Sequence, residues 1–154
     1  MIRRLFLSAD SPDLRTQIDA DLAKKEPDGT WVIPLVIANN SQAIAEHTNI
    51  SVEITNRADC EAVTSFDLSD ASGFNKGRCI YMKEVAGVIH KGLNLAVGSM
   101  RVKMKVDRLP KRKLLLAATL YANRMRARKV DFNIHFTSKG FRLIKTESSF
   151  LDQS

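Results

Sequence analysis

The sequence predicts an all-β domain built from antiparallel strands. Apolar and polar residues alternate with a period of two in three segments, residues 50–54, 102–106 and 130–136. Successive side chains point to opposite sides of a strand, so this alternation is typical of strands with one buried and one solvated face. Short turn-forming stretches rich in Gly, Asn, Asp and Ser separate the apolar segments, which favours many strands over a few long helices.

The first two predicted strands precede residue 40. Residues 14–22 fit an alternating strand, but also a helix with apolar residues four positions apart, and we favour the strand. Residues 31–38 are a continuous apolar run that contains Pro34. Because proline donates no backbone hydrogen bond, we expect this strand at a sheet edge or beside a bulge.

Residues 111–129 allow two interpretations. Their composition favours a helix, and an apolar stripe at helical spacing is formed by Leu114, Ala118, Tyr121 and Met125. A strand over 114–122 would instead complete a meander between the strands at 101–106 and 130–136. We favour the meander, with a last strand at 141–144 after a Lys-Gly turn.

Part of this pattern resembles a known fold family. Residues 35–41, which end in Asn39-Asn40-Ser41, and the alternating residues 50–54 resemble the second and third strands of bacterial immunoglobulin-like modules. The chain is also similar to the sandwich that follows Schlafen-like ATP-binding or DNA-binding domains in some bacterial proteins. The resemblance implies an immunoglobulin-like antiparallel β-sandwich of seven or eight strands, with Trp31 and Tyr121 in its core. It carries no functional residue across, and the Cys-Trp-Cys spacing of antibody domains is absent.

Length and composition indicate one domain over residues 1–154, with a core from about 14 to 145. The chain has 154 residues, of which 44% are hydrophobic. No apolar run approaches the roughly 20 residues of a membrane-spanning helix. The apolar part of residues 1–7 is too short for a signal peptide. We therefore expect no membrane span, a cytoplasmic location and two reduced thiols.

No catalytic or metal-binding motif stands out. The three histidines are scattered without ligand spacing, at His47, His90 and His135. Cys60 and Cys79 match no zinc or redox signature, and a free cysteine commonly packs as a small hydrophobic residue. Arg78 beside Cys79 is the one hint of an activated thiol. We predict a protein that is not an enzyme and that uses no cofactor and no metal.

Positive charge is concentrated in one segment. The formal net charge is +7, and residues 101–129 hold eleven basic residues against one acidic residue. These eleven candidate binding residues are Arg101, Lys103, Lys105, Arg108, Lys111, Arg112, Lys113, Arg124, Arg126, Arg128 and Lys129. If the strands at 101–106 and 114–122 form a hairpin, their side chains make one cationic stripe about 25–30 Å long.

The expected function is that of a non-catalytic interaction or accessory module whose partner is another protein or domain. The alternative is a nucleic-acid-binding module that contacts phosphates through the cationic stripe. Exposed aromatic residues are not interleaved with these cations, which favours backbone contact over base reading. Acidic lipid, or no ligand at all on a solvated face, would also account for the charge.

Overall fold

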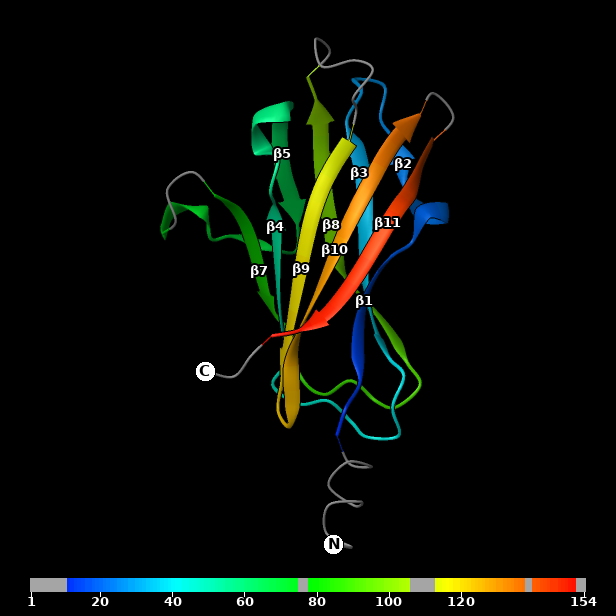
Figure 1. Ribbon diagram of the computed structural model, residues 1–154, viewed down its shortest axis with the longest axis vertical. Coiled ribbons are helices and arrows are strands. Elements are labelled where there is room, and N and C mark those ends of the chain that lie inside the picture. Colours follow the sequence, from blue (N-terminus) through cyan, green and yellow to red (C-terminus); the bar gives the residue numbers. More distant parts are fainter. Residues whose placement is uncertain (1–10, 75–77, 106–112, 138–139, 152–154) are drawn as a thin grey trace, which may run out of the picture.

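The structure is a computed structural model that describes residues 11–74, 78–105, 113–137 and 140–151 (Figure 1). In these residues it contains eleven strands, three short 3-10 helices and no α-helix. All strand pairs are antiparallel, and they form two sheets. The prediction of an antiparallel all-β fold is therefore confirmed, with more strands than the seven or eight expected.

Sheet A has the strand order β1-β3-β8-β5, with β2 also paired to β3. Its strands are β1 (Leu14–Ile18), β2 (Lys24–Lys25), β3 (Trp31–Asn39), β5 (Cys60–Phe66) and β8 (Asn94–Met104). Sheet B has the order β11-β10-β9-β4-β7-β6. Its strands are β4 (Asn49–Ile54), β6 (Ser69–Asp70), β7 (Cys79–Glu84), β9 (Lys113–Ala122), β10 (Met125–Thr137) and β11 (Gly140–Phe150). The 3-10 helices are η1 (Ala20–Leu22), η2 (Arg57–Asp59) and η3 (Ser72–Phe74).

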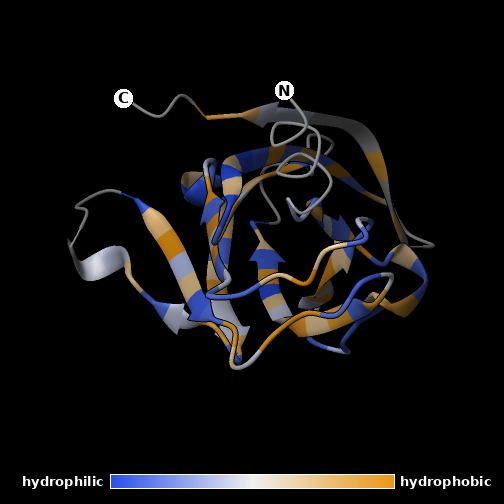
Figure 2. Ribbon diagram, turned by 90° about the horizontal axis from the view of Figure 1, so that it is seen from below, coloured by the Kyte–Doolittle hydropathy of each residue, from blue (hydrophilic) through white to orange (hydrophobic). Residues whose placement is uncertain are grey.

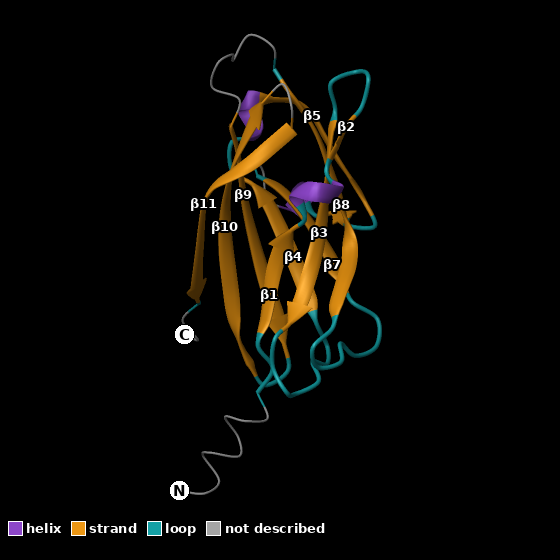
Figure 3. Cartoon of the chain, turned by 90° about the vertical axis from the view of Figure 1, so that its right-hand side faces the viewer, coloured by secondary structure: helices purple, strands orange, loops and turns teal. Residues whose placement is uncertain are grey.

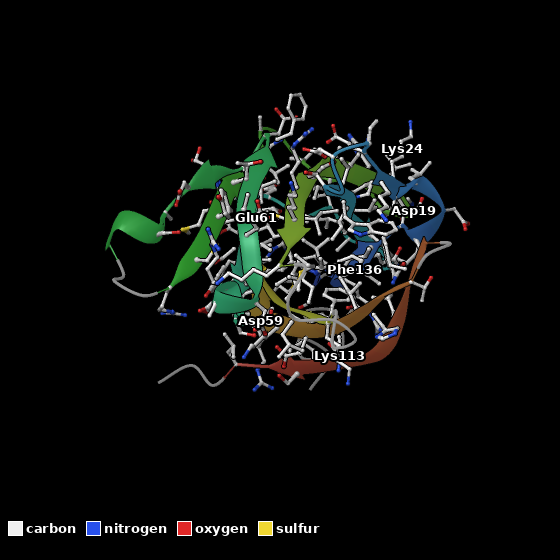
Figure 4. The ribbon with its side chains drawn as sticks, turned by 90° about the horizontal axis from the view of Figure 1, so that it is seen from above. Asp19, Lys24, Asp59, Glu61, Lys113 and Phe136 are labelled. Atoms are coloured by element: carbon white, nitrogen blue, oxygen red, sulfur yellow. The ribbon has the colours of Figure 1, made fainter. Side chains whose placement is uncertain are left out.

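The two sheets pack face to face around one apolar core, and the ribbons alternate in hydropathy along the strands (Figures 2 and 3). The apolar positions of residues 50–54 and 130–136 are buried, as are Val102 and Met104. Trp31 of sheet A stacks on Phe136 of sheet B, with ring centroids 5.1 Å apart, and Phe136 lies between the sheets in Figure 4. The predicted inward faces are confirmed for every described residue of the three segments.

Pro34 lies in a central strand, because β3 pairs with β8 on one side and with β1 and β2 on the other. The expected edge position is therefore wrong, and the expected bulge is present. The register between β3 and β8 shifts after Leu35, which pairs with Gly98, to Val36, which pairs with Ala96. Pro34 also falls between the residues of β3 that pair with β1 and those that pair with β2. Both surroundings tolerate a missing backbone donor.

The two ambiguous segments are strands over most of their length. Residues 14–18 form β1, whereas the 3-10 helix η1 follows and leaves Leu22 exposed. Within the described part of residues 111–129, the chain forms β9, a tight turn and the start of β10. Burial of alternate leucines against the other sheet therefore outweighs the helix propensity of this composition.

The predicted meander is correct only in its second half. Strands β9, β10 and β11 are sequential neighbours in sheet B. Strand β8, however, pairs with β3 and β5 in sheet A, and β9 pairs with β4 and β10 in sheet B. The chain therefore crosses between the sheets after Met104, and the hairpin on which a continuous cationic stripe depended does not exist.

Asn39 fixes the turn that follows β3. Its side chain is buried and uses its full hydrogen-bonding capacity. The Nδ2 atom donates to the carbonyl oxygens of Ala43 and Ile89, at 2.9 and 3.1 Å. The Oδ1 atom accepts from the amide and the hydroxyl of Ser41, at 3.1 and 2.6 Å. The Asn-Asn-Ser sequence thus ties two loops together at one end of the sandwich.

Candidate interaction surfaces

The structure separates the basic residues of the predicted stripe. Arg108, Lys111 and Arg112 lie outside the described residues. The other eight are distributed over both sheets: Arg101 and Lys103 in β8, Lys105 after it, Lys113 in β9, Arg124 in the β9–β10 turn, and Arg126, Arg128 and Lys129 in β10. Two sheets and both ends of the sandwich are involved, so these side chains do not line one continuous surface.

Acidic residues from outside the basic segment pair with its cations on sheet A. Arg101 forms an ion pair with Glu26, and Lys103 Nζ lies 3.8 Å from Glu61 Oε1. These carboxylates lie far away in the sequence but beside β8 in the fold, so a count of charges along the chain could not anticipate the pairing. The pairing lowers the net charge that this face offers to an anion.

Arg128 is a structural residue rather than a solvent-facing cation. Its side chain is only 9% exposed, and its Nη1 lies 2.7 Å from Asp13 Oδ1. The guanidinium also stacks over the Phe150 ring, 4.5 Å from the ring centroid. Arg128 therefore connects the chain before β1 with β10 and β11, and the expectation that it belongs to a ligand-facing stripe is corrected.

Arg128→Gln is expected to lower the free energy of unfolding by about 2–3 kcal/mol, because it breaks a buried ion pair and its cation–π contact. Arg126→Gln is the matched control: Arg126 is exposed on the same strand and also lies over the Phe150 ring, 5.2 Å from its centroid, but has no buried ion pair within the described residues. It should change stability by about 1 kcal/mol or less. Urea denaturation of both variants measures the difference. Equal effects would show that the Arg128 contacts do not stabilise the fold.

Lys105 and Lys113 both adjoin the loop at residues 56–59, and Figure 4 shows Asp59 and Lys113 at this end of the sandwich. The Lys105 amide donates to the Asp59 carbonyl oxygen at 3.0 Å, and the Lys113 carbonyl oxygen accepts from Asn56 Nδ2 at 2.6 Å. The loop at residues 56–59 thus holds the end of β8 and the start of β9 close to each other. This pair is what the described structure retains of the predicted cationic stripe.

The outer face of sheet B carries a hollow of mixed polar and apolar lining that the sequence did not indicate. Met82 and Tyr121 are 43% and 44% exposed on this face, while Ile80 and Ala117 lie buried beside them. The hollow has a volume of about 400 Å³ and is lined by Ser51, Glu53, Ala71, Arg78, Ile80, Met82, Ala117, Thr119, Tyr121, Lys129 and Leu151. The expected core position of Tyr121 is wrong, because Tyr121 alternates with the buried Leu120 along β9.

Ion pairs border this hollow. Arg78 donates to both carboxylate oxygens of Glu53, at 2.8 and 2.6 Å. These hydrogen bonds hold the pKa of Glu53 below its usual value. Lys129 Nζ lies 3.7 Å from Asp131 Oδ1. The surface therefore combines apolar side chains with hydroxyl groups and with charges of both signs, a mixture that occurs at protein interfaces.

The two thiols face the core and are not activated. Cys60 and Cys79 are both buried, and burial raises the pKa of Cys60 to about 11 and also raises the pKa of Cys79. The sequence hint that Arg78 activates Cys79 is wrong, because Arg78 precedes β7 and pairs with Glu53 on the outer face of sheet B, whereas Cys79 is buried in the core. In the described part of the chain, no three His, Cys, Asp or Glu side chains gather as metal ligands.

The raised pKa of Cys60 predicts a loss of stability in alkali. A thiol whose pKa is higher in the folded state favours folding below its unfolded pKa of about 8.5, and this contribution disappears as the pH rises towards 11. Between pH 8 and 11 the free energy of unfolding of the parent chain should fall on the order of 2–3 kcal/mol more than that of Cys60→Ala, as measured by urea denaturation. Parallel pH profiles for the two proteins would contradict this.

Comparison with protein-family models found no match, and comparison with curated protein sequences found none either. None of the helices in the described residues has the length and apolar character needed to cross a membrane.

Proposed function

We propose that this chain is a non-catalytic, immunoglobulin-like interaction module that binds another protein through the outer face of sheet B. The observation that carries the proposal is the hollow around Met82 and Tyr121, two large apolar side chains exposed on a rigid sheet. Aromatic residues and methionine are enriched at protein interfaces, and exposed apolar patches often mark them. We expect the module to act in the cytoplasm.

Strand order supports the immunoglobulin-like assignment. The order β1-β3-β8-β5 matches the A-B-E-D sheet of constant-type domains, and β10-β9-β4 matches the G-F-C sheet. The additional strands lie at the two edges of sheet B, with β11 beside β10 and the β7–β6 pair beside β4. These additions widen sheet B, and the β7 addition forms part of the hollow.

The chemistry of the hollow indicates the kind of partner. The apolar side chains Ile80, Met82 and Tyr121 favour an apolar side chain from the partner, because contact with it removes apolar surface from water. The hydroxyls of Ser51 and Thr119 can bind a polar group beside it. The Glu53–Arg78 and Lys129–Asp131 pairs at the rim offer both signs of charge. The expected partner is therefore a protein segment that presents an apolar side chain flanked by polar or charged groups, rather than a uniformly charged polymer.

Site-specific photo-cross-linking tests the proposal. A benzophenone amino acid replaces either Tyr121 in the hollow or Phe66 on sheet A, which is more exposed and controls for indiscriminate apolar capture. In cells that make the protein, we expect a discrete protein adduct from position 121 but not from position 66. Met82→Ser should reduce the yield of that adduct. No adduct from position 121, or the same adducts from both positions, would contradict the proposal.

A second candidate function is phosphate binding at the end of the sandwich that carries Lys105 and Lys113, because the backbones of both lysines adjoin the loop at residues 56–59. In that case the affinity for duplex DNA should fall steeply between about 50 and 200 mM salt. Replacing both Lys105 and Lys113 with Gln should flatten the slope of log affinity against log salt concentration by up to about 0.9 per lost phosphate contact. The matched control replaces Arg101 and Lys103, whose charges are paired, with Gln. Negligible binding near 150 mM salt would exclude this candidate.

A further inference from the structure

A further hollow lies on the outer face of sheet B, next to the one around Tyr121. It has a volume of about 230 Å³ and is lined on this face by Thr55, Leu115, Ala117, Asp131 and Asn133. Leu115 is 39% exposed and contributes a large apolar side chain to it. Ala117 lines both hollows, so the two meet at this small residue.

The two hollows together form a groove that follows β9, which we call the β9 groove. The side chains of β9 on this face are Leu115, Ala117, Thr119 and Tyr121. From Leu115 to Tyr121 the groove is about 20 Å long, at about 3.3 Å per residue. Strands β4 and β10 pair with β9 on its two sides, so their outer side chains form the walls of the groove (Figure 1).

The width of the β9 groove favours an extended peptide over a helix. Neighbouring strands are about 4.8 Å apart, so the walls on β4 and β10 stand about 10 Å apart across β9. An α-helix with its side chains is about 10–12 Å wide and would not enter between them, whereas an extended chain is narrower. Both edges of β9 are already paired, so the peptide would bind through side-chain contacts and not as an added strand.

Two carboxylates flank the middle of the β9 groove. Glu53 of β4 and Asp131 of β10 pair with Ala117 from opposite sides. Both oxygens of Glu53 accept hydrogen bonds from Arg78. The Asp131 side chain, in contrast, is 50% exposed, and its 3.7 Å contact with Lys129 is longer than a hydrogen bond. The Asp131 carboxylate can therefore accept a hydrogen bond from a cation that lies over Ala117.

We propose that the β9 groove binds an extended peptide segment with two apolar side chains about four to six residues apart and a Lys or Arg between them. The two apolar side chains occupy the hollows at Leu115 and Tyr121, which sets their separation at about 3.3 Å per residue. The basic side chain pairs with Asp131. This inference rests on the proposed function, since the same face binds the partner, and it adds the extended backbone, the second apolar contact and the central charge.

Selection from a displayed library of random peptides, each about twelve residues long, tests the inference on the full chain, because this length exceeds that of the groove. We expect the enriched peptides to carry two apolar residues about four to six positions apart, with Lys or Arg between them. Enriched peptides with apolar residues three and four positions apart, as on one face of a helix, would overturn the proposal. A selection without enrichment would overturn it as well.

Variants test the contacts of a selected peptide. Leu115→Ser should bind it about 10-fold more weakly, because the variant lacks one of the two apolar contacts. Leu22→Ser is the matched control, at a leucine that is 57% exposed in η1, and should bind like the parent. The parent should prefer a peptide with Lys over one with Gln at the central position, and Asp131→Asn should bind both about equally. Absence of this preference in the parent would overturn the assignment of the central charge.

Met82→Ser separates this inference from the proposed function, because Met82 lines the hollow at Tyr121 but not the hollow at Leu115. Weaker binding of the peptide in Met82→Ser with unchanged binding in Leu115→Ser would overturn the inference and leave the proposed interface intact. Unchanged binding in both variants would mean that the peptide binds outside the β9 groove, which also overturns the inference. The proposed function itself depends on the cross-linking result at position 121, which is independent of the peptide library.

Discussion

Val52→Asp is expected to leave the chain largely unfolded at 25 °C. Val52 is fully buried at the centre of β4, between β7 and β9, where it faces the opposite sheet. An unpaired carboxylate at that position costs several kcal/mol, against a total stability of about 5–15 kcal/mol for a typical domain. Circular dichroism and urea denaturation measure the result.

Glu53→Ala is the matched control for this variant. Glu53 is the next residue of β4 and points to the outer face, where it pairs with the exposed Arg78. Surface ion pairs contribute at most about 1 kcal/mol, so this variant should fold and differ little from the parent. Comparable losses in Val52→Asp and Glu53→Ala would mean that the inner and outer faces of β4 are assigned incorrectly.

Gly98→Ala is expected to destabilise the fold by about 3 kcal/mol or more. Gly98 has a φ of +147° next to the β3–β8 bulge, a conformation that residues with a side chain rarely adopt. A Cβ atom here would lie 2.4 Å from the Phe66 carbonyl oxygen and 2.5 Å from Leu68 Cδ1. Because one neighbour is backbone, relief requires β5 to move away from β8, which adds to the conformational strain.

Gly73→Ala provides the comparison for this second variant. A Cβ atom at Gly73 would meet nothing within 4 Å, and its φ lies outside the left-handed region. Its free energy of unfolding should stay within about 0.5 kcal/mol of that of the parent. If thermal denaturation gave Gly98→Ala the same midpoint as Gly73→Ala, the close approach of β5 to Gly98 would be wrong.

The buried faces of the strands follow from local sequence patterns. The alternating segments around Val52, Val102 and Phe132 point inward as their periodicity predicted, because a strand next to an apolar core must place every second side chain in it. The bulge beside Pro34 follows from the same kind of local rule, since proline lacks a backbone donor. Such features depend only on neighbouring residues.

The pairing of the strands, in contrast, is a property of the whole fold. Because β8 and β9 lie in different sheets, the basic residues do not form one continuous stripe. In the fold, Arg101 and Lys103 pair with acidic residues, and Arg128 is buried against Asp13. The fold also places Cys60 beside Met104. The periodicity of a sequence predicts the inner face of a strand, but it does not predict which strand will pair with it. The partner depends on long-range loop closure and on how the two sheets fill the core together, which no local pattern of residues specifies.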